Sequence, residues 1–118
     1  MQEAIVLQRP FVIGFTGTSV TAGHDNLFEE SYPRVVHSQL GRIFAATGVA
    51  FEGRNGAMGN NPPAPYEFCL SRFAGADPDI VSWEMNMMVA GHQCPGADVE
   101  AFVRTALALP SQPAVLVL

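Results

Sequence analysis

Positive charge, cysteine and long apolar runs are all scarce in this 118-residue sequence. Six Lys and Arg stand against eleven Asp and Glu, which gives a formal net charge of −5. Nucleic acids and anionic lipids are bound by clustered basic side chains, so this composition argues against both partners. No apolar run approaches the roughly 20 residues of a membrane-spanning helix. Glu3 stands where a signal peptide would have its basic region, so we expect no secretory leader, and the compartment stays undetermined.

The two cysteines, Cys69 and Cys94, are too few for a disulfide framework or a four-cysteine metal site. Two ordinary buried thiols are the favoured interpretation, and a disulfide between them is the alternative. His92 and Cys94 form a pair of metal-ligand types, but two ligands do not make a site. The sequence therefore predicts no metal ion.

Apolar residues are plentiful, at 48% of the chain, and glycine and proline divide them into short runs and amphipathic stretches. Short apolar runs are typical of buried strands, and apolar residues at three- and four-residue steps are typical of helices. We predict strands at 11–15, 49–51, 80–83 and 113–118, and helices at 32–47, at 66–73 and from the N-cap Asp98 onward. Pro33 suits the first turn of the long helix, and Gly48 suits a left-handed residue after its end. The alternation predicts an α/β fold, a doubly wound, flavodoxin-like three-layer sandwich with a parallel sheet.

We expect a single domain over residues 1–118, because the chain shows no repeat and no linker. Its last predicted strand, 113–118, is apolar throughout, and parallel strands of that kind are normally covered by helices on both faces. We therefore expect the native domain to continue beyond Leu118, with this chain as its N-terminal portion. Nothing in the sequence indicates the oligomeric state.

Three of the predicted strands are followed by segments that could carry chemistry. Residues 14–23 place Ser19 in a glycine-bearing turn just past the first strand. Glycines within residues 54–60 could direct a backbone N–H group at an anion, and the segment after the third strand adds the side-chain amide of Asn86. In open α/β sheets, reactive groups gather at the carboxyl ends of the strands. A serine flanked by such donors is what acyl transfer needs, since the donors stabilise the developing oxyanion.

These segments, in this order, resemble the first three sequence blocks of the SGNH (GDSL-like) hydrolases. The motifs that carry the resemblance are Gly-Thr-Ser-Val-Thr-Ala-Gly at 17–23, the glycine at 59 and the asparagine at 86. The resemblance implies that Ser19 is the nucleophile and that its backbone N–H, the N–H of Gly59 and the amide of Asn86 form the oxyanion hole. It implies a serine esterase or acyl hydrolase that acts on a small-molecule ester or an acylated glycan or lipid. No cofactor is implied, since serine hydrolysis uses only the protein's own groups.

Two positions depart from the family pattern. Thr18 stands where the family usually has the Asp of Gly-Asp-Ser, and Glu84 stands where its third block, Gly-x-Asn-Asp, usually begins with glycine. A carboxylate close to the oxyanion would oppose the charge that develops there, unless it is paired or points away. These two residues put efficient catalysis, although not the fold, in question.

The general base is the larger gap. The family supplies a His, usually three residues after an Asp, from a late block, and no Asp-x-x-His occurs in this sequence. Of the histidines His24, His37 and His92, the best internal substitute is His92, because it follows the third strand. We nevertheless expect all three to be ordinary surface or loop residues, and this chain alone to be inactive.

Other interpretations remain open at the level of sequence. Ser19 could cap a turn, Gly59 could be needed only for a positive backbone angle, and Asn86 could bond to a neighbouring turn. Thr18 and Glu84 motivate a second hypothesis, a non-catalytic SGNH-like module that binds a glycan or acyl group or serves as a scaffold. A third, a nucleotide-binding βαβ unit, is disfavoured because the chain lacks a usable Gly-x-Gly-x-x-Gly and any Gly-Lys-[Ser/Thr].

Overall fold

The computed structural model describes residues 2–85 and 95–118. In chain order its elements are α1 (Gln2–Val6), β1 (Phe11–Gly17), α2 (Ser19–Ala22), η1 (Phe28–Glu30), α3 (Tyr32–Ala45), β2 (Phe51–Asn55), α4 (Pro63–Tyr66), η2 (Glu67–Cys69), α5 (Leu70–Phe73), β3 (Ile80–Glu84), α7 (Pro95–Leu107) and β4 (Ala114–Val117). Asn86, His92 and Cys94 lie outside the described residues. Within the described part, every helix is too short or too polar to cross a membrane.

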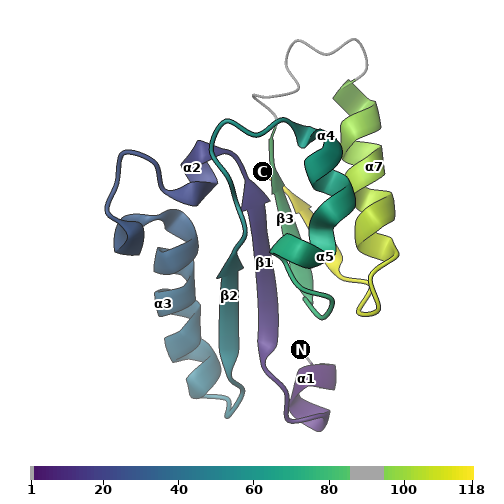
Figure 1. The fold of residues 1–118 in the computed structure, drawn as a ribbon. Helices are drawn as coiled ribbons and strands as arrows, with labels where there is room; N and C mark the ends of the chain where they lie inside the picture. The colour runs from purple at the N-terminus through teal and green to yellow at the C-terminus, as the bar shows by residue number, and fades with distance from the viewer. Residues whose placement is uncertain (1, 86–94) are drawn as a thin grey trace.

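The strands form one four-stranded parallel sheet in the order β2-β1-β3-β4 (Figure 1). β1 lies inside the sheet and pairs with β3 from Ile13↔Ile80 to Gly17↔Glu84. Parallel strands connected through helices define the α/β class, so the predicted fold class is confirmed. Because all four strands point the same way, their carboxyl ends lie at one edge of the sheet.

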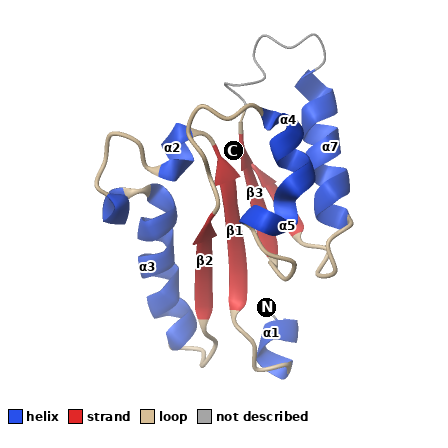
Figure 2. Cartoon of the chain, viewed as in Figure 1, coloured by secondary structure: helices blue, strands red, loops and turns tan. Residues whose placement is uncertain are grey.

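Helices cover both faces of this sheet (Figure 2). α3 packs against β2 and the neighbouring part of β1, where the ring of Phe44 lies 5.1 Å from the ring of Phe11 and 5.1 Å from that of Phe51. α5 and α7 lie on the opposite face, over β3. The arrangement of helix, sheet and helix is the three-layer sandwich that the sequence predicts.

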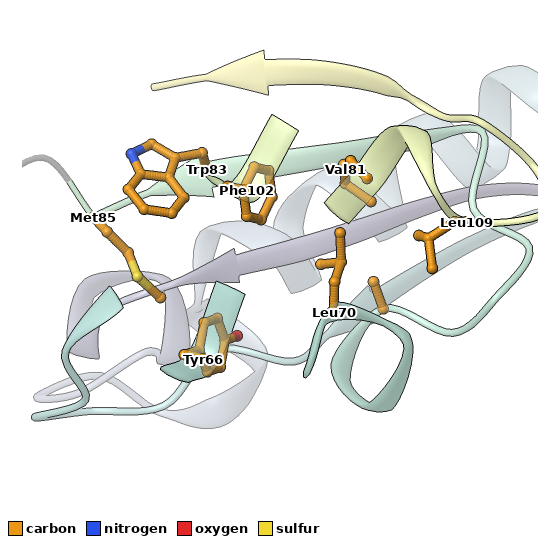
Figure 3. Packing of buried hydrophobic residues seen from close by; sticks show 9 residues of the cluster. Tyr66, Leu70, Val81, Trp83, Met85, Phe102 and Leu109 are labelled. Carbon is orange, nitrogen blue, oxygen red and sulfur yellow. The ribbon is translucent and has the colours of Figure 1, made fainter. Parts of the chain in front are cut away.

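The larger hydrophobic core lies between β3 and the helices α5 and α7 (Figure 3). Val81, Trp83 and Met85 occupy every second position along and just past β3, so their side chains share one face, and all three are fully buried. The Trp83 ring lies 5.0 Å from the ring of Phe102 in α7. The other buried members of this core are Tyr66, Leu70, Ala74, Ala106 and Leu109.

The second strand differs from its prediction. β2 begins at Phe51 rather than at residue 49, and it continues to Asn55, four residues past the predicted end. The reason is tertiary: residues 51–55 are paired with β1 over their whole length. A glycine in that stretch, Gly53, reads as a turn signal in the sequence although it lies inside the strand.

Two helices also begin or end at other residues than predicted. α7 begins at Pro95, so Asp98 lies in its first turn and is not the N-cap. α3 ends at Ala45, slightly earlier than predicted, and Gly48 adopts the expected left-handed conformation with φ 75°. α1 and α2 have five and four residues, too few to produce a periodic pattern, and the sequence did not predict them.

Candidate active site

Ser19 lies at the carboxyl edge of the sheet, immediately after β1, in a segment that we call the Ser19 turn (residues 17–23). It is the first residue of α2, and the side chain of the N-cap residue, Thr18, accepts a hydrogen bond from Val20 N. Gly23 ends the helix with φ 89°, and its N–H donates to the carbonyl oxygen atoms of Ser19 and Val20. Ser19 itself is partly exposed. The turn therefore holds Ser19 at the edge where open α/β sheets bind their ligands.

The end of β2 and the loop after it are attached to β1 and the Ser19 turn by three hydrogen bonds. Two are between backbone groups: Gly56 N donates to the carbonyl oxygen of Phe15 (2.9 Å) and Met58 N to that of Gly17 (3.2 Å). The third comes from the side chain of Asn55, whose Nδ2 donates to the carbonyl oxygen of Thr21 at 3.0 Å. The glycine block and the serine block, 40 residues apart as Ser19 and Gly59, are thereby brought together.

Gly59 lies next to Ser19. A Cβ atom added to Gly59 would lie 3.5 Å from the Cβ of Ser19, in van der Waals contact, and 3.3 Å from Nε2 of the exposed His24. The left-handed residue of the loop is Asn60, with φ 54°, and Gly59 is not among the residues with positive φ. The alternative that Gly59 is needed only for a positive backbone angle is therefore wrong. What the structure does establish for Gly59 is its place directly beside Ser19.

Glu84, the last residue of β3, is paired with the Ser19 turn. Its Oε2 accepts hydrogen bonds from Thr18 N (3.1 Å), Thr18 Oγ1 (2.8 Å) and Thr21 Oγ1 (2.9 Å). Its backbone carbonyl oxygen also accepts from Thr18 N, at 3.2 Å. The two departures from the family pattern, Thr18 and Glu84, thus contact each other, and the carboxylate is paired in the way that would limit its effect on an oxyanion.

A further hydroxyl group connects this cluster to α3. Thr21 Oγ1 lies 2.9 Å from Tyr32 Oη, and because Thr21 gives its proton to Glu84, Tyr32 is the donor in this pair. Burial raises the pKa of Tyr32, and the negative charge of Glu84 contributes in the same direction. The phenol therefore remains protonated, and able to donate, at neutral pH. Thr21 is fully buried at the centre of the cluster.

Thr21, Tyr32 and Asn55 were not identified from the sequence as parts of this site. The sequence did contain a signal for Thr21. Its hydroxyl group belongs to the motif at 17–23, and Glu84 places a carboxylate that could accept from it at the end of the neighbouring strand. No comparable signal marks Tyr32 or Asn55, because their contacts depend on how α3 and β2 dock beside β1.

The candidate bases are placed differently from one another. The exposed imidazole of His24 lies close to Gly59, since its Nε2 would be 3.3 Å from a Cβ atom added there. His37 is a structural residue, because its Nδ1 accepts a hydrogen bond from Gly53 N at 2.9 Å and links α3 to β2. His92 and the third oxyanion-hole candidate, Asn86, lie outside the described residues, so their roles stay predictions.

Cys69 is a free, exposed thiol, so the prediction that it is buried is wrong. Its neighbours Tyr66 and Leu70, four positions apart on successive helical turns, take the buried side instead. Among residues 2–85 and 95–118, no group of three or more His, Cys, Asp and Glu side chains is arranged to hold a metal ion.

No protein-family model and no curated protein matches the chain. The solved structures that match include two crystal structures of a two-domain esterase (CEX) active on acetylated mannans, one of them co-crystallised with mannopentaose. Their TM-scores are 0.79 and 0.78, at 20% sequence identity, and the match covers 98% of this chain. The chain is similar in fold to an esterase. It spans 32% of that esterase's chain, about a third of its length.

Proposed function

We propose that this chain carries the nucleophile of a serine-dependent carboxylic-ester hydrolase whose substrate is an acylated carbohydrate. The observation that carries the proposal is the placement of Ser19 beside Gly59 at the carboxyl edge of a parallel sheet. The fold similarity to an esterase active on acetylated mannans supports the choice of an acylated glycan over a lipid ester.

In the proposed reaction, a base takes the proton of Ser19 Oγ as this oxygen attacks the ester carbonyl carbon, and the carbonyl oxygen becomes an oxyanion. The N–H groups of Ser19 and Gly59 and the amide of Asn86 donate to that oxygen. The intermediate collapses to an acyl-serine and releases the sugar hydroxyl, which takes up a proton from the protonated base. Water then attacks the acyl-serine, so that a carboxylic acid leaves and Ser19 regains its proton. We expect the base to be a histidine from another part of the native polypeptide.

The alternative, a non-catalytic glycan-binding module, was motivated by Thr18 and Glu84. The hydrogen bonds between these residues weaken that motive, because a carboxylate that accepts three donors projects less unbalanced charge toward a bound ester.

The test is the replacement Ser19→Ala in the complete native polypeptide, assayed on p-nitrophenyl acetate and on acetylated mannan oligosaccharides. Loss of the nucleophile is expected to lower kcat by at least about 10³-fold, with the fold and the KM for the oligosaccharide little changed. Ser38→Ala is the matched control, since Ser38 is an exposed serine of α3. Unchanged hydrolysis by Ser19→Ala would exclude Ser19 as the nucleophile. Saturable oligosaccharide binding by wild-type protein without hydrolysis would favour the binding module.

A further inference from the structure

A single carboxylate oxygen of Glu84 accepts three hydrogen bonds from the Ser19 turn. Its Oε2 accepts from the backbone and the hydroxyl of Thr18, the residue before Ser19, and from the hydroxyl of Thr21, two residues after it. The carboxylate thus bonds to both sides of Ser19 without any hydrogen bond to Ser19 itself among the described contacts. Three bonds to an ionised acceptor are stronger than the same bonds to a neutral one.

The Ser19 turn also receives hydrogen bonds from Met58 N and Asn55 Nδ2, but these reach only the carbonyl oxygens of Gly17 and Thr21. α2 has only four residues, and a helix of one turn is unstable on its own, because nucleation fixes several dihedral angles for one hydrogen bond. Its N-cap also depends on Glu84: Thr18 Oγ1 gives its proton to the carboxylate, which leaves a lone pair free to accept from Val20 N. The carboxylate, which can only accept, therefore directs the proton of this hydroxyl away from Val20 N.

The far side of the turn depends on Glu84 in the same way. Thr21 Oγ1 donates its one proton to the carboxylate, so it must be the acceptor in its hydrogen bond with Tyr32 Oη. The hydrogen bonds therefore run in one direction, from Tyr32 on α3 through Thr21 to Glu84 on β3. Space at the centre is filled, because a Cβ added to Gly17 would overlap Thr21 Oγ1 and lie 2.9 Å from Glu84 Oε2.

We infer that Glu84 is the positioning residue of the nucleophile: from β3, its carboxylate fixes the backbone and the hydroxyl groups that orient Ser19. The inference rests on the proposed function for the role of Ser19. Glu84 touches neither the ester nor the reacting atoms in this role, and it acts through Thr18 and Thr21. Its removal therefore lowers the reactivity of Ser19 more than it lowers substrate affinity.

The first experiment measures the second-order rate constant for labelling of Ser19 by a fluorophosphonate in the complete native polypeptide, together with kcat and KM on p-nitrophenyl acetate. Glu84→Gln keeps the shape of the side chain but removes the charge, and we expect the labelling constant and kcat to fall about 10²-fold with KM unchanged. Glu52→Gln is the control, because Glu52 is a strand carboxylate that pairs with Arg54 (2.8 Å), away from the Ser19 turn. Labelling of Glu84→Gln at the wild-type rate would overturn the inference while leaving the proposed function intact.

Conservative variants separate positioning from general stability. Thr18→Ser retains the hydroxyl group, and its labelling rate constant should stay within a few-fold of the wild-type value. In the isosteric Thr18→Val the labelling rate constant should fall nearly as far as in Glu84→Gln. The double variant Glu84→Gln/Thr18→Val should be little worse than either single variant, because both changes remove the same interaction. Equal labelling by Thr18→Ser and Thr18→Val, or fully additive losses in the double variant, would contradict this route.

A second readout does not need a reactive serine. Amide hydrogen exchange at residues 18–23 should be about tenfold faster in Glu84→Gln than in Glu52→Gln, with exchange in β1 and β3 unchanged. If wild-type Ser19 is not labelled at all, the proposed function fails, and the exchange measurement still decides whether Glu84 holds the turn. Equal exchange in the two variants would show that it does not.

Discussion

On one face of β3, Val81 and Trp83 are fully buried against α5 and α7, whereas on the other face Glu84 accepts hydrogen bonds from the Ser19 turn. The two faces alternate along five residues of one strand. The apolar face derives its free energy from burial and packing, which tolerate small shifts of position but not loss of volume. The polar face instead fixes the directions of hydrogen bonds, since the hydroxyl groups of Thr18 and Thr21 each donate their one proton to Glu84. The same strand therefore stabilises the fold through one face and, in the role proposed for Glu84, orients Ser19 from the other.

Removal of the largest side chain from the apolar face should have the largest effect on stability. Trp83→Ala is expected to lower the free energy of unfolding by about 3–5 kcal/mol, because Trp83 is fully buried and its ring packs on Phe102. Leu116→Ala is the control on β4: Leu116 is 48% exposed, and its loss should cost only about 1 kcal/mol. Urea denaturation measures both. Equal losses would mean that the core is not centred on this face.

A pair of glycines on β1 compares the two faces directly. A Cβ at Gly14 would lie 2.5 Å from the Cβ of Ala74 on the apolar side, whereas a Cβ at Gly17 would meet Thr21 and Glu84 on the polar side. Each alanine variant should lose about 1–3 kcal/mol of stability through overpacking. Only Gly17→Ala should also slow fluorophosphonate labelling of Ser19, measured under conditions where both variants are folded. Loss of labelling in Gly14→Ala as well would break the separation of the two faces.

The amino end of β3 offers a carboxylate with a purely stabilising role. Asp79 accepts from Arg9 at 2.7 and 2.8 Å and from Val12 N at 2.8 Å. Burial alone would raise the pKa of Asp79, but these bonds outweigh it and hold the pKa below its ordinary value. Asp79→Asn should therefore cost about 1–2 kcal/mol at pH 7 and should leave labelling of Ser19 unchanged.

The pH dependence follows from the direction of this shift. Since the folded-state pKa is depressed, the stabilisation by Asp79 is complete above the unfolded-state value of about 4 and disappears as the pH falls through the folded-state value. Urea denaturation between pH 7 and pH 2.5 should show the difference between wild type and Asp79→Asn shrinking on acidification. Asp25→Asn is the control, because Asp25 is exposed and asparagine tolerates its φ of 65°. A difference that is constant with pH would argue against a charged Asp79–Arg9 pair.

The smallest effect is expected on the solvent side of α7, the helix that covers the apolar face. Arg104 and Glu100 form an i,i+4 pair with a 2.7 Å contact, and their side chains are 77% and 62% exposed. Arg104→Ala should change the free energy of unfolding by less than about 0.5 kcal/mol, because exposed pairs of this kind contribute little. If Arg104→Ala lowered the midpoint of thermal unfolding by as much as Trp83→Ala, the exposed ion pair would contribute as much to stability as the buried core.

Some of the site was within reach of the sequence. The spacing of Ser19 and Gly59 after two apolar runs was sufficient to predict that both lie at one edge of a parallel sheet, because parallel strands end at the same side. Glu84 was recognised as a possible source of repulsion, but its pairing with Thr18 was not predicted. The missing information was the register Gly17↔Glu84, which brings the two strand ends level and which a sequence does not specify.

The sequence by itself determined the class of fold, the approximate places of the strands along the chain and the residues offered for chemistry, since these depend on local periodicity and on the order of segments. Tertiary structure decided the extent of β2, the exposure of Cys69 and the cluster that joins Glu84, Thr21 and Tyr32. Each of these depends on which backbone a segment meets after folding. Strand pairing extends a strand beyond its local preference, and the direction of a hydroxyl proton is set by the acceptor that docking places beside it.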